Sequence, residues 1–232
     1  MAINIYENDM DGETVRLENK EDLSHLDARF SEHLSAKQKE FFTNYPQSLE
    51  KIIDCLEVKA ELTSLSHWLK SLLKVKPKLE ICTSAWSDPK VWIRFFLRNR
   101  EEDGRIWFPA IDLADLPDDD VKSCPTILTD VFGAIGKIKL YGLLEAGGLI
   151  FPEHNIYWGF NDLSEEAKAD REDDKYMVYQ TSSGDTFCYN EAGSTFWYDH
   201  EVDIARPYST MNDFLNDLFV FLAKEQEYQR PR

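Results

Sequence analysis

Residues Tyr176 to Leu218, with the sequence YMVYQTSSGDTFCYNEAGSTFWYDHEVDIARPYSTMNDFLNDL, decide the fold of this chain. Bulky and polar residues alternate in the first part with the period of two that lets a strand bury one face. The bulky residues are Tyr176, Val178, Phe187, Tyr189, Phe196 and Tyr198. Residues 183–185 (SGD) and 190–193 (NEAG) are predicted turns, because glycine, asparagine and aspartate accept positive φ. We therefore expect three short antiparallel strands.

A helix is predicted to follow these strands. After Pro207 the apolar residues recur at spacings of three and four, which places them on one side of a helix. They are Met211, Phe214, Leu215, Leu218, Phe219 and Leu222. Ser209 or Thr210 can cap its first turn, where the helix dipole favours the negative charge of Asp213. The sheet is thus expected to close against a terminal helix.

The first hundred residues predict helices followed by strands. Residues 23–45 and 48–74 carry apolar residues at helical spacing on either side of Tyr45-Pro46, and we expect them to form a hairpin. Residues 79–86, 91–97 and 105–108 are rich in β-branched and aromatic residues and are predicted strands.

The expected fold class is α+β, with a mostly antiparallel sheet packed against helices and an N-terminal helical extension. The polar, acidic stretch between Pro109 and Pro125 is the one place that resembles a domain boundary. We place the division there, with a helical and β extension over 1–110 and an α+β domain over 111–232. One continuous globular unit is the alternative.

Two stretches resemble the SUKH superfamily of protein-binding domains. One is the strand-turn-strand SSGDTFCYNEAGSTFWYDHE (residues 182–201) with the helix after it. The other is LPDDDVKSCPTILTDVFGAIGKI (residues 116–138), in which Pro125, Leu128, Phe132 and Gly136 are similar to the family's proline-led helix ending in a glycine turn. The resemblance covers roughly Leu116 to Leu222. It implies a function like that of known members, which include a cell-wall synthesis regulator and immunity proteins that neutralise toxins.

The charge of the chain limits its partners. The formal net charge is −17, and residues 101–200 hold 21 acidic and 7 basic side chains, or −14, whereas residues 51–100 hold 5 and 10, or +5. Such a field repels nucleic acid and anionic membranes and speeds encounters with cationic partners. A role in solubility alone is the other interpretation. The basic stripe Lys70, Lys74, Lys78, Lys90, Arg94 and Arg98 either binds a second partner or contacts the acidic half.

Cysteines and apolar runs indicate a cytoplasmic protein. Cys55, Cys82, Cys124 and Cys188 are widely spaced and lie in apolar runs, so we expect buried thiols rather than a zinc site or disulfides. The N-terminus lacks the features of a signal peptide, and no stretch approaches the length of about 20 apolar residues that a membrane span needs.

Candidate catalytic groups are few, and no motif requires a cofactor or a metal. Asp199 and Glu201 could share a strand face while His200 points away, so a dyad would need a partner such as Asp185 or Glu191. Asp118, Asp119 and Asp120 are consecutive carboxylates without calcium-loop spacing, which indicates a solvated turn.

Binding is the main functional prediction. Tyr157 and Trp158 belong to an aromatic group that could anchor a partner or continue a strand. Together with the acids they give the predicted partner-binding set: Tyr157, Trp158, Asp185, Glu191, Trp197, Asp199, His200 and Glu201. The expected partner is a cognate, basic protein toxin. The alternatives are a hydrolase with a carboxylate-lined site, perhaps a glycan hydrolase, and a cell-wall or signalling scaffold.

Overall fold

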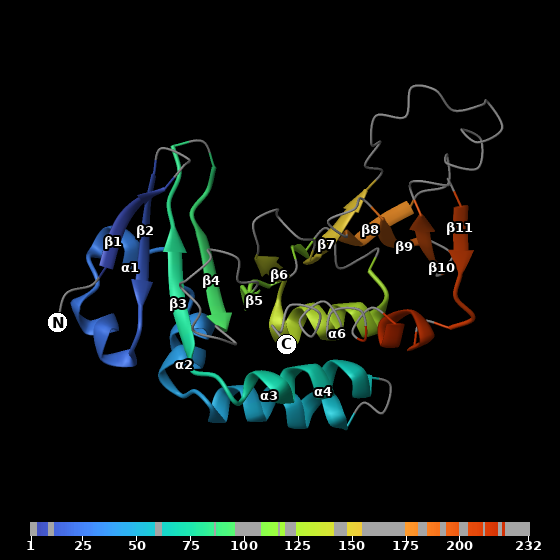
Figure 1. Ribbon diagram of the computed structural model, residues 1–232, viewed down its shortest axis with the longest axis horizontal. Helices are drawn as coiled ribbons and strands as arrows, with labels where there is room; N and C mark the ends of the chain where they lie inside the picture. The colour runs from blue at the N-terminus through green and yellow to red at the C-terminus, as the bar shows by residue number, and fades with distance from the viewer. Residues whose placement is uncertain are drawn as a thin grey trace, which may run out of the picture.

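The protein is an α+β fold built from two antiparallel sheets and a layer of helices (Figure 1). The computed structural model describes residues 4–8, 12–58, 62–85, 87–95, 108–115, 117–118, 124–141, 148–154, 175–180, 185–190, 194–199, 204–210, 212–217 and 220. The predicted fold class is confirmed.

Sheet A has six strands, each hydrogen-bonded to the next in chain order. They are β1 (Asn4–Asn8), β2 (Gly12–Leu17), β3 (Pro77–Cys82), β4 (Lys90–Phe95), β5 (Phe108–Ile111) and β6 (Ile138–Tyr141). The register aligns Val15 with Ile81 and Ile81 with Val91, so aliphatic side chains form rows across one face. These rows are buried and face the helices.

Sheet B has five strands in the order β11-β10-β9-β8-β7, again antiparallel. They are β7 (Gly148–His154), β8 (Lys175–Gln180), β9 (Thr186–Asn190), β10 (Thr195–Asp199) and β11 (Ile204–Pro207). The three predicted strands are therefore confirmed as β8, β9 and β10. The register shifts between Met177 and Tyr179, where a bulge turns the face that β8 presents.

Helices cover the two sheets on one side. They are η1 (Lys20–His25, a 3-10 helix), α1 (Ala28–Ser31), α2 (Ala36–Thr43), α3 (Gln47–Glu57), α4 (Thr63–Leu72), α6 (Thr126–Ile135) and a C-terminal helix at residues 212–217. In Figure 1, α6 lies below sheet B and the α3–α4 hairpin lies below α6. The buried residues of α6, Leu128, Val131, Phe132 and Ile135, recur at spacings of three and four and therefore lie on one face of the helix.

The first half differs from the prediction in its helices. The stretch predicted as one helix over 23–45 is divided, because Asp27 and Ser35 each cap a new helix by accepting a backbone N–H, from Arg29 and Gln38 respectively. The stretch predicted over 48–74 is also divided, into α3 and α4. These two helices form the hairpin, which was wrongly predicted between 23–45 and 48–74.

The N-terminal hairpin of β1 and β2 was not predicted. Gly12 begins β2 so close to β3 that a Cβ atom there would lie 2.0 Å from the carbonyl oxygen of Thr83. The amide of Glu13 donates to Thr83 Oγ1 at 3.0 Å, and the Thr83 amide donates to the Glu13 carbonyl at 2.8 Å. Strands β1 and β2 therefore belong to sheet A, and the first half is not a helical extension alone.

One hydrophobic core runs through the described residues, from Val15 on β2 to Leu215 on the C-terminal helix. Ser64 on α4 also donates a hydrogen bond of 2.7 Å to Asn216 Oδ1 on that helix. The predicted division between 110 and 111 falls inside β5, whose neighbours in sheet A are β4 and β6. Whether the chain folds as one unit or two remains a prediction.

Candidate functional site

Three of the eight predicted partner-binding residues are described: Asp185, Trp197 and Asp199. All three lie on sheet B, at or next to strands β9 and β10. The other five lie outside the described residues: Tyr157, Trp158, Glu191, His200 and Glu201.

The acidic end of sheet B, which we define by Asp185, Asp199 and Arg206, brings two of the predicted acids together. The register pairs Tyr198 with Thr186, so the next residues on the two strands, Asp199 and Asp185, lie at the same end of the sheet. Carboxylates on neighbouring strands repel each other. Arg206 on β11 reduces this repulsion, since its Nη2 lies 3.5 Å from Asp199 Oδ2.

A hydrolase site would need these acids to converge with Glu191 or Glu201. Of these four acids the structure describes Asp185 and Asp199, and it places those two together. The carboxylate-lined site therefore remains a prediction.

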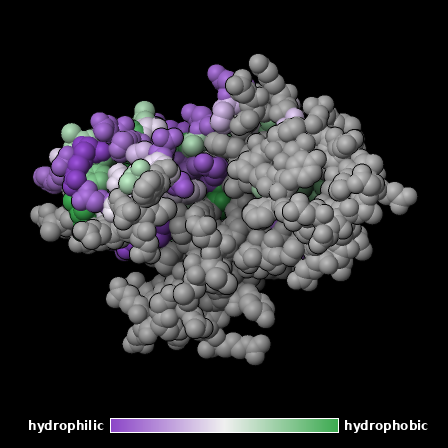
Figure 2. Space-filling model, turned by 90° about the horizontal axis from the view of Figure 1, so that it is seen from above, coloured by the Kyte–Doolittle hydropathy of each residue, from purple (hydrophilic) through white to green (hydrophobic). Residues whose placement is uncertain are grey.

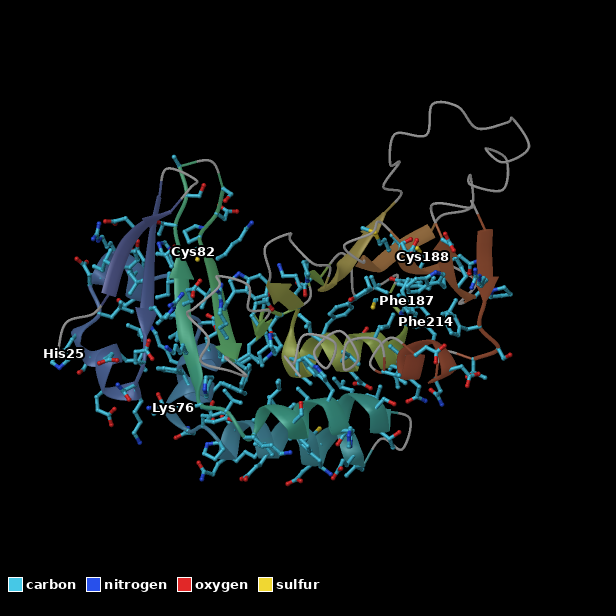
Figure 3. The ribbon with its side chains drawn as sticks, viewed as in Figure 1. His25, Lys76, Cys82, Phe187, Cys188 and Phe214 are labelled. Atoms are coloured by element: carbon cyan, nitrogen blue, oxygen red, sulfur yellow. The ribbon has the colours of Figure 1, made fainter. Side chains whose placement is uncertain are left out.

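Trp197 has a different role from a freely exposed anchor. It lies opposite Phe187 in the register, and the ring centroids are 4.4 Å apart at an angle of 89°. Phe187 also contacts Phe214 at 5.3 Å, and both point into the space between sheet B and the helices (Figure 3). Trp197 is thus partly buried against the core. The alternation selected Phe196 and Tyr198 as the bulky residues of this strand, but it is Trp197 that lies opposite Phe187.

Tyr208 extends this aromatic cluster to the C-terminal helix. Its ring packs edge-on to Phe214 at 5.5 Å. Burial raises the pKa of Tyr208 to about 12, and the nearby Asp217 carboxylate, which accepts a hydrogen bond from the hydroxyl, adds to the shift. The helix is capped by Thr210, whose Oγ1 accepts from the Asp213 amide at 3.1 Å, as predicted.

The basic stripe of the first half does not form one free cationic surface. Three of its members pair with acids from the same half: Lys70 with Glu57, Lys78 with Glu18 at 2.8 Å, and Arg94 with Glu80 at 2.6 Å. One of our two interpretations expected the stripe to contact the acidic half. These three contacts are instead with acids of the first half. The described surface seen in Figure 2 is mainly hydrophilic, with small hydrophobic patches.

Glu80 is the centre of a buried ionic network on sheet A. Its Oε1 binds Arg94, and its Oε2 accepts from Nε and Nη2 of Arg16, each at 3.1 Å. The side chains of Glu80 and Arg94 are almost completely removed from solvent. Burying charges is costly unless they are paired, so the three side chains stabilise one another in place.

A second buried polar cluster joins α2 to the ends of β5 and α6, and it was not predicted from the sequence. Asp112 Oδ1 accepts from the amides of Lys137 (2.7 Å) and Ala114 (3.0 Å). Burial raises the pKa of Asp112, while these bonds and Lys137 oppose the shift. Gln38 donates to the Asp112 carbonyl at 2.6 Å. Because backbone groups satisfy this carboxylate, its role is structural.

Metal and thiol chemistry receive little support from the described residues. Among them no three metal-ligating side chains gather, and Asp118 is exposed while Asp119 and Asp120 lie outside this set. All four cysteines are described, and none forms a disulfide. Cys124 and Cys188 are buried as predicted, but Cys82 is half-buried and Cys55 on α3 is exposed, so the prediction of a buried thiol was wrong for these two.

No helix in the described ranges is long and apolar enough to cross a membrane. Comparisons of this chain with models of protein families, with curated proteins and with solved structures gave no match.

Proposed function

We propose that this protein is a binding module that inhibits a basic protein, most concretely a cytoplasmic immunity protein of the SUKH type that neutralises a toxin domain. The observation that carries the proposal is the acidic end of sheet B, where Asp185 and Asp199 lie side by side. The absence of disulfides among the four cysteines supports a reducing compartment.

Electrostatics favour a cationic partner at this end. Two neighbouring carboxylates that repel each other gain free energy when a lysine or arginine approaches both. Several basic side chains of the protein are already paired with its own acids, and the chain still carries a net charge of −17. This excess speeds the encounter with a basic surface, such as that of a nuclease toxin.

The mode of inhibition would be coverage of the partner's active site. Asp185 and Asp199 supply the charged part of the interface. The predicted anchors Tyr157 and Trp158 supply apolar area. Trp197 lies two residues from Asp199 on β10, and its ring packs edge-on against Phe187.

Charge reversal tests the proposal. The protein is co-expressed with the product of the neighbouring gene, and the dissociation constant of the purified pair is measured for wild type, for Asp185→Lys/Asp199→Lys and for Glu50→Lys/Asp54→Lys. The last variant changes two exposed acids on α3 and alters the net charge equally. We expect the sheet B variant to weaken binding about tenfold or more, and the α3 variant to have little effect.

Equal effects of the two variants would contradict an interface at sheet B and leave only a role for net charge. Raised salt should weaken the wild-type complex, because the Debye length falls from about 10 Å at 0.1 M to about 3 Å at 1 M. A partner that is toxic when expressed alone supports immunity. A harmless partner supports the scaffold alternative.

A further inference from the structure

We infer that the outer edge of β1 binds an extended segment of a partner protein in which a lysine or arginine and an aliphatic residue are two positions apart. This site lies on sheet A and does not rest on the proposed function of sheet B. The partner's strand would continue sheet A beyond β1 by backbone hydrogen bonds.

The edge strands of the two sheets differ in their protection. β11, at one edge of sheet B, ends in Pro207, which has no N–H to donate, and carries the exposed Arg206. Prolines and cations are common devices that prevent a further strand from pairing. β1, at one edge of sheet A among the described strands, has the sequence NIYEN with neither, and its five residues pair with β2 without a bulge.

An aliphatic row of sheet A ends at β1 without being covered. Ile5 lies opposite Val15, Val15 opposite Ile81, and Ile81 opposite Val91. Val15, Ile81 and Val91 are buried, whereas Ile5 remains 45% exposed. Val15 and Ile81 are each paired with a residue of a neighbouring strand on both sides, so an aliphatic residue on one more strand would complete the cover of Ile5.

The next row on the same face determines the charge that we expect on the partner. Glu7 lies two residues from Ile5 and opposite Glu13, which places two acids together in the register. Glu13 binds Arg29 on α1 at 2.6 Å. A lysine or arginine level with Glu7 on the added strand would bring a cation to a register position that holds two acids and, at Glu13, one arginine. The net charge of −17 also disfavours a second copy of this chain as the occupant.

The register fixes the order of the two residues in the partner. In an antiparallel pair, the residue opposite Glu7 precedes the residue opposite Ile5 by two positions, just as Glu13 precedes Val15 on β2. The partner segment therefore reads Lys/Arg-x-Ile/Val from its N-terminus to its C-terminus.

Synthetic peptides of about six residues, a usual strand length, test the inference. One contains Lys-x-Val with threonines elsewhere, and the control contains Glu-x-Val. NMR titration of the full protein should show that the lysine peptide shifts the β1 amides and slows their hydrogen exchange. Ile5→Lys should weaken this binding about tenfold or more, whereas Val58→Lys, at a residue 86% exposed on α3, should not.

Glu7→Lys provides a second variant, which should reverse the preference in favour of the glutamate peptide. Thermal unfolding of each variant checks that it is folded. Equal binding of both peptides, unchanged affinity in the Ile5 variant, or no effect on the β1 amides would overturn the inference. A dimer in ultracentrifugation that Ile5→Lys dissociates would also overturn it, since the occupant would then be a second copy.

Discussion

Gly136 connects α6 to sheet A through a backbone conformation that other residues rarely adopt. Its φ is +66°, and its amide donates to the Phe132 carbonyl at 2.8 Å to close the last turn. A Cβ atom at this position would lie 2.2 Å from Asp112 Oδ1. Glycine is therefore required at this position for two reasons, the positive φ and the close approach of a buried carboxylate.

Gly136→Ala should consequently lower the free energy of unfolding by about 1–3 kcal/mol. Gly133→Ala is the matched control, because a Cβ atom on Gly133 in α6 meets nothing within 4 Å. In a helix interior this change should stabilise the protein by roughly 0.5–1 kcal/mol. Urea denaturation measures both values, and similar losses in the two variants would contradict the role of Gly136.

At the scale of residues, the sequence predicts turns and helix caps better than it predicts which face of a strand a side chain occupies. The glycine turn at Gly136 and the cap at Thr210 were predictable because turns and caps depend on nearby atoms. Phe196, Trp197 and Tyr198 are all aromatic, so alternation alone could not show that Trp197 is the residue aligned with Phe187. In the candidate site, Asp185 and Asp199 lie at the same end of sheet B because of this same register.

At the scale of elements, the α3–α4 hairpin shows a signal that was present in the sequence but missed. Leu49, Ile53 and Leu56 follow one helical phase, and the pattern restarts at Leu62 and Leu65 on what would be another side of a continuous helix. The change of phase marks the break between two helices. The hairpin of β1 and β2 also had a signal, the dipeptide Asp11-Gly12, which is typical of tight turns.

The tyrosine at the junction of α2 and α3 holds the end of the α3–α4 hairpin. The Tyr45 hydroxyl donates a hydrogen bond that two backbone carbonyls share, those of Leu72 (2.9 Å) and Val75 (2.7 Å). Leu72 is the last residue of α4, and its carbonyl also accepts from the Val75 amide at 3.0 Å. Val75 lies in the segment between α4 and β3. Burial, followed by repulsion from Glu50, raises the pKa of Tyr45 to about 12.

Tyr45→Phe should lower the free energy of unfolding by about 1 kcal/mol at pH 8. Ionisation is harder in the folded protein than in the unfolded chain, so the contribution of the hydroxyl is complete below pH 10 and is lost as the pH rises towards 12. The difference between wild type and variant in urea denaturation should therefore shrink over this window. A constant difference would show that ionisation of Tyr45 is not coupled to unfolding.

At the scale of the whole molecule, the continuous core predicts a single cooperative unfolding transition. Leu215 on the C-terminal helix belongs to the same buried cluster as Val15 on β2. Leu215→Ala should cost about 2–5 kcal/mol and lower the melting temperature of both halves together, whereas Val58→Ala at an exposed site should change little.

Calorimetry checks this prediction, because the van't Hoff and calorimetric enthalpies agree for a two-state transition. Two transitions, with only one shifted by Leu215→Ala, would instead support a division near residue 110. The periodicity of apolar residues could predict the fold class but could not show whether the chain unfolds as one unit or two. The contacts concerned, such as Ser64 with Asn216, join residues far apart in the chain.

The shared core also has a consequence for synthesis on the ribosome. The α3–α4 hairpin emerges with apolar side chains such as Trp68 and Leu69, which in the folded protein are buried in the same core as α6. Roughly fifty residues separate Leu72 from Thr126, and at about 5–20 residues per second they take several seconds to translate. During that interval the nascent chain exposes these apolar side chains to solvent, and we expect chaperones to bind it.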